Sequence, residues 1–205
     1  MSRLEMNSAS LRLLLLDRDG TIMVEKGFPK EPDEVELIPG SAAAIRRLRA
    51  LGLKAVVISN QSGIGRGFLT HEDVARVNAR LGELLAAEGA GLDGLYYCPH
   101  APGDGCACRK PQRTLLDRAA ADLGGDLPRS FFVGDKKDDV DAGRNVGATT
   151  FLVRTGYGEK QTFPEGKGPD YDVADLAEAA TKIEELLRDA RERSKETGPA
   201  FPPGR

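Results

Sequence analysis

Short apolar runs alternate with helix-like segments along most of the chain, and this alternation constrains the fold more than any other feature. The first run, residues 11–16, ends in four consecutive leucines and stops at Asp17. A short continuous apolar run suits a strand buried on both faces. Strands separated by helices imply an α/β fold with a parallel sheet and helices on both faces. Further strands are expected at residues 55–59, 92–98, 131–133 and 149–153.

Helical patterns lie between these runs. Apolar residues at helical spacing predict a helix over residues 41–51, which Gly52 would terminate. Thr70 has the character of an N-cap for a helix that runs to about residue 88. A three-four spacing of apolar residues from Val173 to Leu187 predicts a terminal amphipathic helix packed on the core. Two more helices are expected, over residues 114–123 and from near residue 138.

Length and composition indicate one globular domain, because 205 residues with 40% hydrophobic content can bury a core. We assign residues 11–193 to it, with a flexible N-terminus over 1–10 and a disordered tail over 194–205. No apolar run is long enough to cross a membrane and no signal peptide is evident, so we expect a cytoplasmic protein without a membrane partner. We also expect a monomer. The net charge of -3 argues against nucleic acid as the main partner.

Two carboxylates follow the first expected strand directly. Asp17 and Asp19 are two residues apart, so in an extended chain their side chains project to the same side. Such a pair can hold a hard cation such as magnesium, which prefers oxygen ligands. It can also divide the work of a nucleophile and a general acid/base. The alternative interpretation is a solvated loop after a strand.

Polar groups also follow two later strands. Ser59 and the backbone N–H groups through Gly63 could hold phosphate oxygens, or form only a polar turn. Asp135 could complete a cation site with support from Asp139 one helical turn away, although acidic capping of a helix is the alternative. Active sites in parallel sheets lie beyond the carboxyl ends of the strands. We therefore expect these side chains to gather at one edge of the sheet.

A basic pair precedes the expected helix at residues 114–123. Lys110 can act as a point charge on a phosphate, and Arg109 can grip a second phosphate with two hydrogen bonds. An isolated surface pair is the alternative. The pair nonetheless predicts a phosphorylated partner when it is taken together with the polar strand ends.

The loop before this pair contains all three cysteines and one of the two histidines of the chain. Three thiolates and one imidazole form a closed tetrahedral set suited to structural zinc, whereas free thiols or a disulfide are the alternatives. Because this loop, residues 98–108, ends at Arg109, a bound zinc would fix the direction of the basic pair. The expected zinc ligands are Cys98, His100, Cys106 and Cys108.

The order of these motifs resembles that of the haloacid dehalogenase (HAD) superfamily of phosphohydrolases over roughly residues 11–155. The resemblance implies a Rossmann-like sheet and hydrolysis through a phospho-aspartate. It assigns Asp17 as the nucleophile and Asp19 as the general acid/base. Ser59 and Lys110 would stabilise the transferring phosphoryl group.

The same resemblance implies a magnesium ion. Its ligands would be the Asp17 carboxylate, the Asp19 backbone carbonyl and Asp135, with Asp139 supporting the site from outside. The linkers after the first two strands are short, which leaves little room for a cap domain. The resemblance therefore implies an enzyme with a minimal cap or none.

The cysteine–histidine loop and residues 60–67 narrow the resemblance to the D-glycero-D-manno-heptose 1,7-bisphosphate 7-phosphatases, a subfamily shared with bacterial histidinol-phosphatases. Ser62 and the Gly-x-Arg-Gly ending favour the heptose substrate and so imply a role in lipopolysaccharide precursor synthesis. Ser59 stands where Thr is more usual, and Met23 where Asn is common. By analogy, Arg109 would recognise the phosphate that is not cleaved. The rest of the substrate rim would be Glu25, Lys26, Gly27, Phe28, Asn60, Gln61 and Ser62.

Three other functions remain open from the sequence. Histidinol phosphate is the substrate of the other branch of the subfamily. The polynucleotide 3'-phosphatases share a similar loop and the Arg-Lys-Pro motif, but they lack the cysteine–histidine loop. A catalytically inactive, zinc-stabilised binding module would have lost one of the essential carboxylates, yet Asp17, Asp19 and Asp135 are all present.

Overall fold

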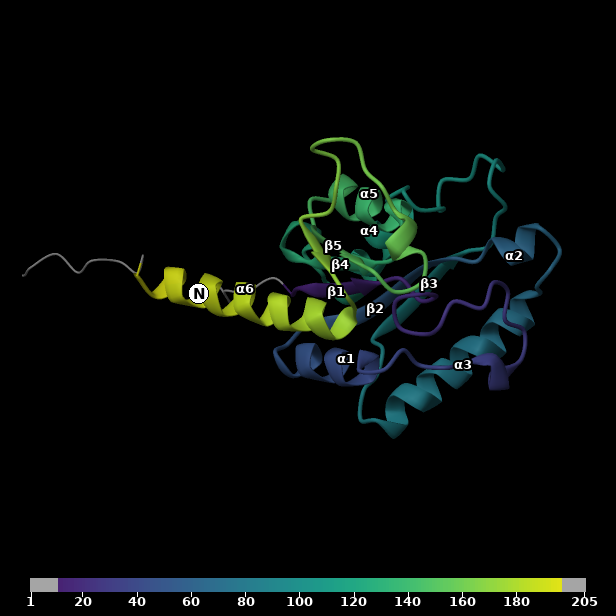
Figure 1. The fold of residues 1–205 in the computed structure, drawn as a ribbon, viewed down its shortest axis with the longest axis horizontal. Helices are drawn as coiled ribbons and strands as arrows, with labels where there is room; N and C mark the ends of the chain where they lie inside the picture. The colour runs from purple at the N-terminus through teal and green to yellow at the C-terminus, as the bar shows by residue number, and fades with distance from the viewer. Residues whose placement is uncertain (1–10, 197–205) are drawn as a thin grey trace, which may run out of the picture.

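The computed structural model describes residues 11–196, and it describes side chains through residue 193. Six parallel strands form one sheet in the order β3-β2-β1-β4-β5-β6 (Figure 1). This confirms the expected α/β, Rossmann-like fold class. The expected flexible N-terminus lies outside the described residues, as does the chain beyond residue 196. The strands are β1 (Leu13–Leu16), β2 (Lys54–Asn60), β3 (Gly94–Cys98), β4 (Phe131–Gly134), β5 (Thr149–Val153) and β6 (Tyr171–Val173).

Helices cover both faces of the sheet, because the side chains of each strand point alternately to the two sides. Leu14 and Leu16 of β1 belong to the core under one group of helices, and Leu13 and Leu15 to the core under the other. The two groups lie on opposite sides of the sheet in Figure 1. The first group is α1 (Ser41–Ala50), α3 (His71–Ala87) and α6 (Leu176–Glu196), and the second is α4 (Thr114–Leu123) and α5 (Lys137–Asn145).

The helix boundaries follow the predicted caps. Thr70 Oγ1 accepts a hydrogen bond from the Asp73 backbone N–H at 3.1 Å at the start of α3. Gly52 has a φ of 93°, a left-handed conformation that suits the residue after a helix end. Such caps satisfy backbone groups that a helix leaves unpaired at its ends.

Two short elements depart from the expectations. Val173 belongs to strand β6, and the terminal helix begins only at Leu176. The apolar spacing could not separate a three-residue strand from the helix that follows it. The segment after β2, for which a polar turn was the alternative interpretation, also contains a short helix, α2 (Ser62–Gly65). The remaining short helices are η1 (Pro32–Glu34), η2 (Leu127–Arg129) and η3 (Gly158–Lys160).

The register of the central strands places their carboxyl ends side by side. Leu16 pairs with Val57 of β2 and with Val133 of β4, and the Asp17 N–H donates to the Val133 carbonyl at 3.0 Å. The chain between β1 and α1 forms only isolated bridges and η1, in agreement with the expected lack of a cap. None of the helices in the described part of the chain has the length and apolar character needed to cross a membrane.

Candidate active site

Three carboxylates from separate parts of the chain meet at the carboxyl ends of β1 and β4. Asp17 follows β1, Asp135 follows β4, and Asp139 lies in the first turn of α5. One oxygen of each lies within 4.8 Å of the others, and all three are buried. Among the described residues, Asp135 Oδ1 has no hydrogen-bond partner. Buried carboxylates need a compensating charge or donor, so this oxygen-rich cluster fits a divalent cation such as magnesium.

A buried lysine stands against this acid cluster. Lys110 Nζ lies 2.8 Å from Asp17 Oδ1 and 2.6 Å from Asp139 Oδ1, and it donates to the Ile58 carbonyl at 2.6 Å. The Asn60 side chain exchanges hydrogen bonds of 2.9 and 3.2 Å with the Lys110 backbone. The end of β2 therefore fixes the position of a lysine that is distant in sequence.

The acids have different pKa values because their surroundings differ. Burial alone would raise the pKa of Asp17, but the charges of Lys110 and Lys136 hold it below its usual value. Burial and the nearby Asp17 charge raise the pKa of Asp135 to about 8. Burial also raises the pKa of Asp139 to about 6, although Lys110 opposes the change. Asp17 is therefore the carboxylate of the cluster that stays ionised over the widest pH range.

Asp19 faces a separate set of donors. Arg18 Nε and Nη2 each donate to its oxygens at 3.0 Å, and Gln61 Nε2 donates to Oδ2 at 2.9 Å. Arg18 is only 1% exposed, and its Nη1 donates to Asn78 Oδ1 of α3 at 2.7 Å. A buried ion pair adds little to stability because desolvation offsets the attraction. The main consequence of this one is a carboxylate held in a single orientation.

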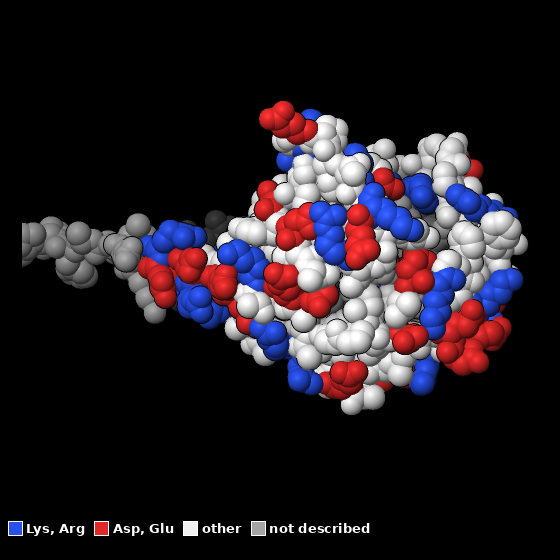
Figure 2. All heavy atoms as spheres, in the orientation of Figure 1, with Lys and Arg blue, Asp and Glu red and all other residues white. Residues whose placement is uncertain are grey.

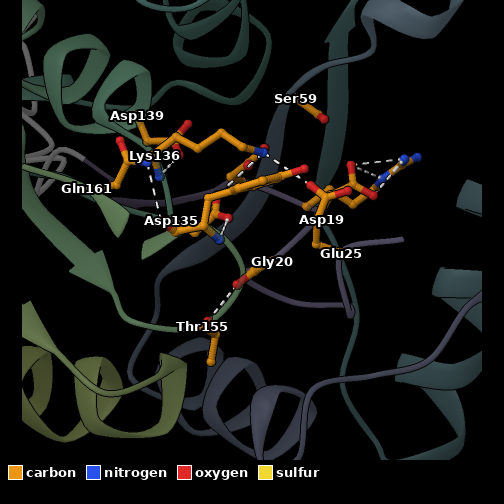
Figure 3. A network of polar contacts seen from close by, with 12 residues as sticks. Asp19, Gly20, Glu25, Ser59, Asp135, Lys136, Asp139, Thr155 and Gln161 are labelled. Atoms are coloured by element: carbon orange, nitrogen blue, oxygen red, sulfur yellow. Dashed lines mark hydrogen bonds and ion pairs between the residues drawn. The ribbon is translucent and has the colours of Figure 1, made fainter. Parts of the chain in front are cut away.

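Two glycines enclose the Asp135 side chain. A Cβ on Gly20 or on Gly156 would lie 2.3 Å from Asp135 Oδ2. The same oxygen accepts the Tyr157 backbone N–H at 2.7 Å. Thr155 Oγ1 donates to the Gly20 carbonyl at 2.6 Å and so ties the two segments together (Figure 3). The loop after β5 therefore helps to position an acid that follows β4.

A cavity of about 350 Å³ opens onto these groups, within the size range of small-molecule sites. Asp17, Asp19 and Lys110 are part of its lining, while Asp135 lies buried beside it. The cavity thus brings the predicted reactive groups and most of the predicted rim together. The rim residues that line it are Glu25, Gly27, Phe28, Asn60, Gln61, Ser62 and Arg109.

Two predicted residues are placed differently. Lys26 does not line the cavity, and its Nζ lies 3.1 Å from Glu36 in an exposed ion pair. Ser59 is buried beneath the lining, and its Oγ accepts a hydrogen bond from Gln61 Nε2 at 2.8 Å. In this structure the Ser59 hydroxyl therefore orients Gln61, which in turn contacts Asp19.

Four cavity residues were not identified from the sequence. Lys136 Nζ lies 3.3 Å from Glu25 Oε2 and 3.7 Å from Asp135 Oδ1. Figure 3 shows Lys136 on the same side of the network as Asp135 and Asp139, away from Asp19. Its position directly after Asp135 was the feature of the sequence that could have identified it as a site residue. The other three are Arg66, Asp138 and Tyr157.

The predicted zinc ligands also come together. Cys98 Sγ lies 3.6 Å from Cys106 Sγ and 3.2 Å from Cys108 Sγ, and His100 Nδ1 is 3.5 Å from Cys98 Sγ. These separations are close to the roughly 3.5–3.8 Å edges of a tetrahedron built from zinc–ligand bonds of about 2.1–2.3 Å. All three cysteines are free thiols. The donor set and its geometry therefore fit a four-coordinate zinc with no open position.

Parallel strands that end in an acid pair, a buried lysine and a further acid define the class of HAD-like hydrolases. A family model described as HAD-hydrolase-like matches residues 107–179. A B. bronchiseptica structure described as D,D-heptose 1,7-bisphosphate phosphatase with magnesium and phosphate superposes with a TM-score of 0.77 at 35% identity. The match covers 86% of this chain and 99% of that one.

Curated relatives define the family more closely. The D-glycero-beta-D-manno-heptose-1,7-bisphosphate 7-phosphatase of Pseudomonas aeruginosa is 41% identical over 174 residues, which cover 83% of this chain and 98% of that protein. The protein of the same name from Escherichia coli is 38% identical over 192 residues, 89% of this chain and 98% of its own length. The chain belongs to the family of heptose-1,7-bisphosphate 7-phosphatases.

Proposed function

We propose that the protein is a magnesium-dependent phosphatase that removes the 7-phosphate of D-glycero-D-manno-heptose 1,7-bisphosphate. The observation that carries the proposal is the buried cluster of Asp17, Asp135 and Asp139 with Lys110 at a small-molecule cavity. The names of the similar proteins support the substrate and favour its β anomer.

Asp17 is the proposed nucleophile, since its lowered pKa keeps it ionised. Its oxygen forms a bond to phosphorus while the bond from phosphorus to the sugar oxygen breaks. Asp19 is the proposed general acid/base: its protonated form gives a proton to that sugar oxygen, and the resulting carboxylate then takes a proton from the water that cleaves the aspartyl phosphate. The Lys110 ammonium group, 2.8 Å from Asp17, is placed to offset negative charge on the phosphoryl oxygens.

Two metal ions are part of the proposal. Asp17, the Asp19 backbone carbonyl and Asp135 would hold magnesium, with Asp139 beside them, and the unpartnered Asp135 Oδ1 fits that role. When bound, magnesium supplies positive charge to the phosphate. Cys98, His100, Cys106 and Cys108 would hold a structural zinc. Burial raises the pKa of the Cys98 thiol to about 12, so a thiolate there requires a cation partner.

A small metabolite suits this protein better than a nucleic acid. Figure 2 shows basic and acidic side chains intermixed on the face it displays. Nucleic-acid binding depends on basic groups gathered on one surface. We also propose that the protein is a cytoplasmic monomer, and light scattering on the purified protein measures its oligomeric state.

A phosphate-release panel tests the function. The substrates are both anomers of the heptose bisphosphate, histidinol phosphate and a 3'-phosphorylated oligonucleotide, each with magnesium. We expect the highest kcat/KM for a heptose bisphosphate and no turnover by Asp17→Asn, because an amide is a poor nucleophile. Asp33→Asn, an exposed acid outside the cavity, is the matched control.

Each other outcome assigns a different function. Preference for the oligonucleotide or for histidinol phosphate would replace the heptose substrate. No turnover of any ester would favour the binding module. Activity of Asp17→Asn equal to the wild type would exclude the covalent step.

A further inference from the structure

We propose that Arg66 is a second phosphate-binding side chain, which acts together with Arg109 on the phosphate that is not transferred. This inference rests on the proposed function and adds a specificity-determining residue to it. Arg66 follows helix α2, and Arg109 follows the cysteine–histidine loop. Both side chains line the cavity that contains Asp17.

The lysines of the cavity are paired with carboxylates, but the two arginines are not. Lys110 is paired with Asp17 and Asp139, and Lys136 with Glu25. In the described part of the chain, neither arginine has a carboxylate within 4 Å, and Asp138, which also lines the cavity, pairs with neither. Arg109 Nη1 is buried and has no hydrogen-bond partner among the described residues. A buried guanidinium N–H without a partner is costly unless a ligand supplies the acceptor.

Arg66 and Arg109 are more exposed to solvent than the reactive groups of the cavity. Asp17 and Lys110 are 4% and 2% exposed, whereas Arg109 is half-buried and Arg66 is exposed. The transferred phosphate must reach Asp17 at the floor, so the arginines are nearer the mouth. A sugar with a phosphate at each end would place its second phosphate there. That dianion suits two guanidinium groups, each of which can donate two hydrogen bonds.

The backbone holds both arginines against one loop. The Gly65 N–H donates to the Pro99 carbonyl at 2.8 Å, and a Cβ on Gly65 would lie 2.4 Å from the Ala101 backbone nitrogen. The end of α2 therefore rests directly on the cysteine–histidine loop, one residue before Arg66. Because Arg109 directly follows Cys108, the same loop supports both side chains. This support fixes the backbone from which both side chains extend, and so lowers the entropy lost on binding.

The test compares kcat/KM for heptose 1,7-bisphosphate with kcat/KM for heptose 7-phosphate, which lacks the second phosphate. The variants are Arg66→Gln, Arg109→Gln and the double variant. Arg80→Gln is the matched control, because Arg80 is a partly exposed residue of α3 that lies outside the cavity and forms an ion pair with Glu83. We expect Arg66→Gln to lower the ratio of the two constants by about 10- to 100-fold, the range for losing a hydrogen bond between charged groups. The double variant should lose less than the product of the single effects, since both arginines would hold one phosphate.

The outcomes separate this inference from the proposed function. An unchanged ratio in Arg66→Gln overturns the inference, whether both substrates become slower or neither does. If the wild type hydrolyses neither heptose substrate, the proposed function fails. Calorimetric titration of the heptose bisphosphate then decides the role of Arg66. Weaker binding to Arg66→Gln than to the wild type supports it, and equal affinities overturn it.

Discussion

Asp135→Asn should stabilise the protein in the absence of magnesium at alkaline pH. Asp135 is completely buried, Asp17 and Asp139 lie next to it, and its pKa rises to about 8. Because the pKa of Asp135 is higher in the folded than in the unfolded state, its contribution to the free energy of unfolding is fully present below the unfolded pKa of about 4. That contribution is lost as the pH rises through the folded pKa of about 8. The amide removes the charge, and its oxygen can still accept the Tyr157 N–H.

The size of the effect follows from this pKa. A carboxyl group whose pKa rises from 3.8 to about 8 lowers the free energy of unfolding by at most about 5 kcal/mol at pH 8. Relaxation and entry of water reduce that penalty, so we expect a gain of about 2 kcal/mol for Asp135→Asn at pH 8. This corresponds to a rise of about 4–8 °C in Tm for a chain of this length. At pH 5 the gain should be smaller, because the group is protonated in the folded wild type.

The assay is thermal unfolding at pH 5 and pH 8, with and without magnesium, after dialysis against magnesium-free buffer. Magnesium at about one hundred times its Kd should stabilise the wild type by about 2.7 kcal/mol. It should have little effect on the variant, which lacks one ligand charge. Asp138→Asn, in the same acidic segment but outside the carboxylate cluster, is the control. A lower Tm of Asp135→Asn at pH 8, or equal stabilisation of both proteins by magnesium, would refute this reasoning.

Three further substitutions test other contacts. Gly20→Ala should weaken magnesium binding at least tenfold and lower the free energy of unfolding by about 1–3 kcal/mol, because its Cβ would overlap Asp135 and its φ is 82°. Magnesium titration and thermal unfolding measure these effects. Wild-type values in both would contradict the enclosure of Asp135. Cys106→Ser should lower the zinc content and Tm; elemental analysis and calorimetry give the result, and an unchanged Tm would count against a structural zinc. Arg18→Gln should lower kcat about 10- to 100-fold with little change in KM, because Asp19 loses two hydrogen bonds from a charged donor. A change confined to KM would show that Arg18 acts on substrate binding instead.

The sheet and the acid cluster could be predicted because each depends on a pattern along the chain. Each of the five longer strands is a short, mainly apolar run between helical segments, and parallel connectivity brings the ends of central strands together. Asp17 and Asp135 therefore had to meet once β1 and β4 were adjacent. The cysteine–histidine set was predictable for a similar reason, since its ligands are too close in sequence to lie far apart.

Side-chain direction in the loops could not be predicted in this way. Arg18 lies between two acids, where an exposed side chain would be expected, yet it is buried against Asn78 of α3. Lys26 was expected at the rim, but it turns to Glu36. Lys136 was not identified, although it lines the cavity and its ammonium group lies 3.3 Å from Glu25. These pairings join segments that are remote in sequence, and no periodicity in the sequence encodes them.

The charges at the floor of the cavity explain why cation and phosphate binding should be linked. When Asp17, Asp135 and Asp139 are ionised, Lys110 and Lys136 compensate their charges only in part, because Lys136 also pairs with Glu25. Burial is the main cause of the raised pKa values of Asp135 and Asp139, and the charge of Asp17 adds to both shifts. A phosphate dianion is repelled by such a floor, but a divalent cation offsets its negative charge. The cation therefore compensates the buried acids and lowers the repulsion of the phosphate, which links the binding of magnesium to the binding of phosphate.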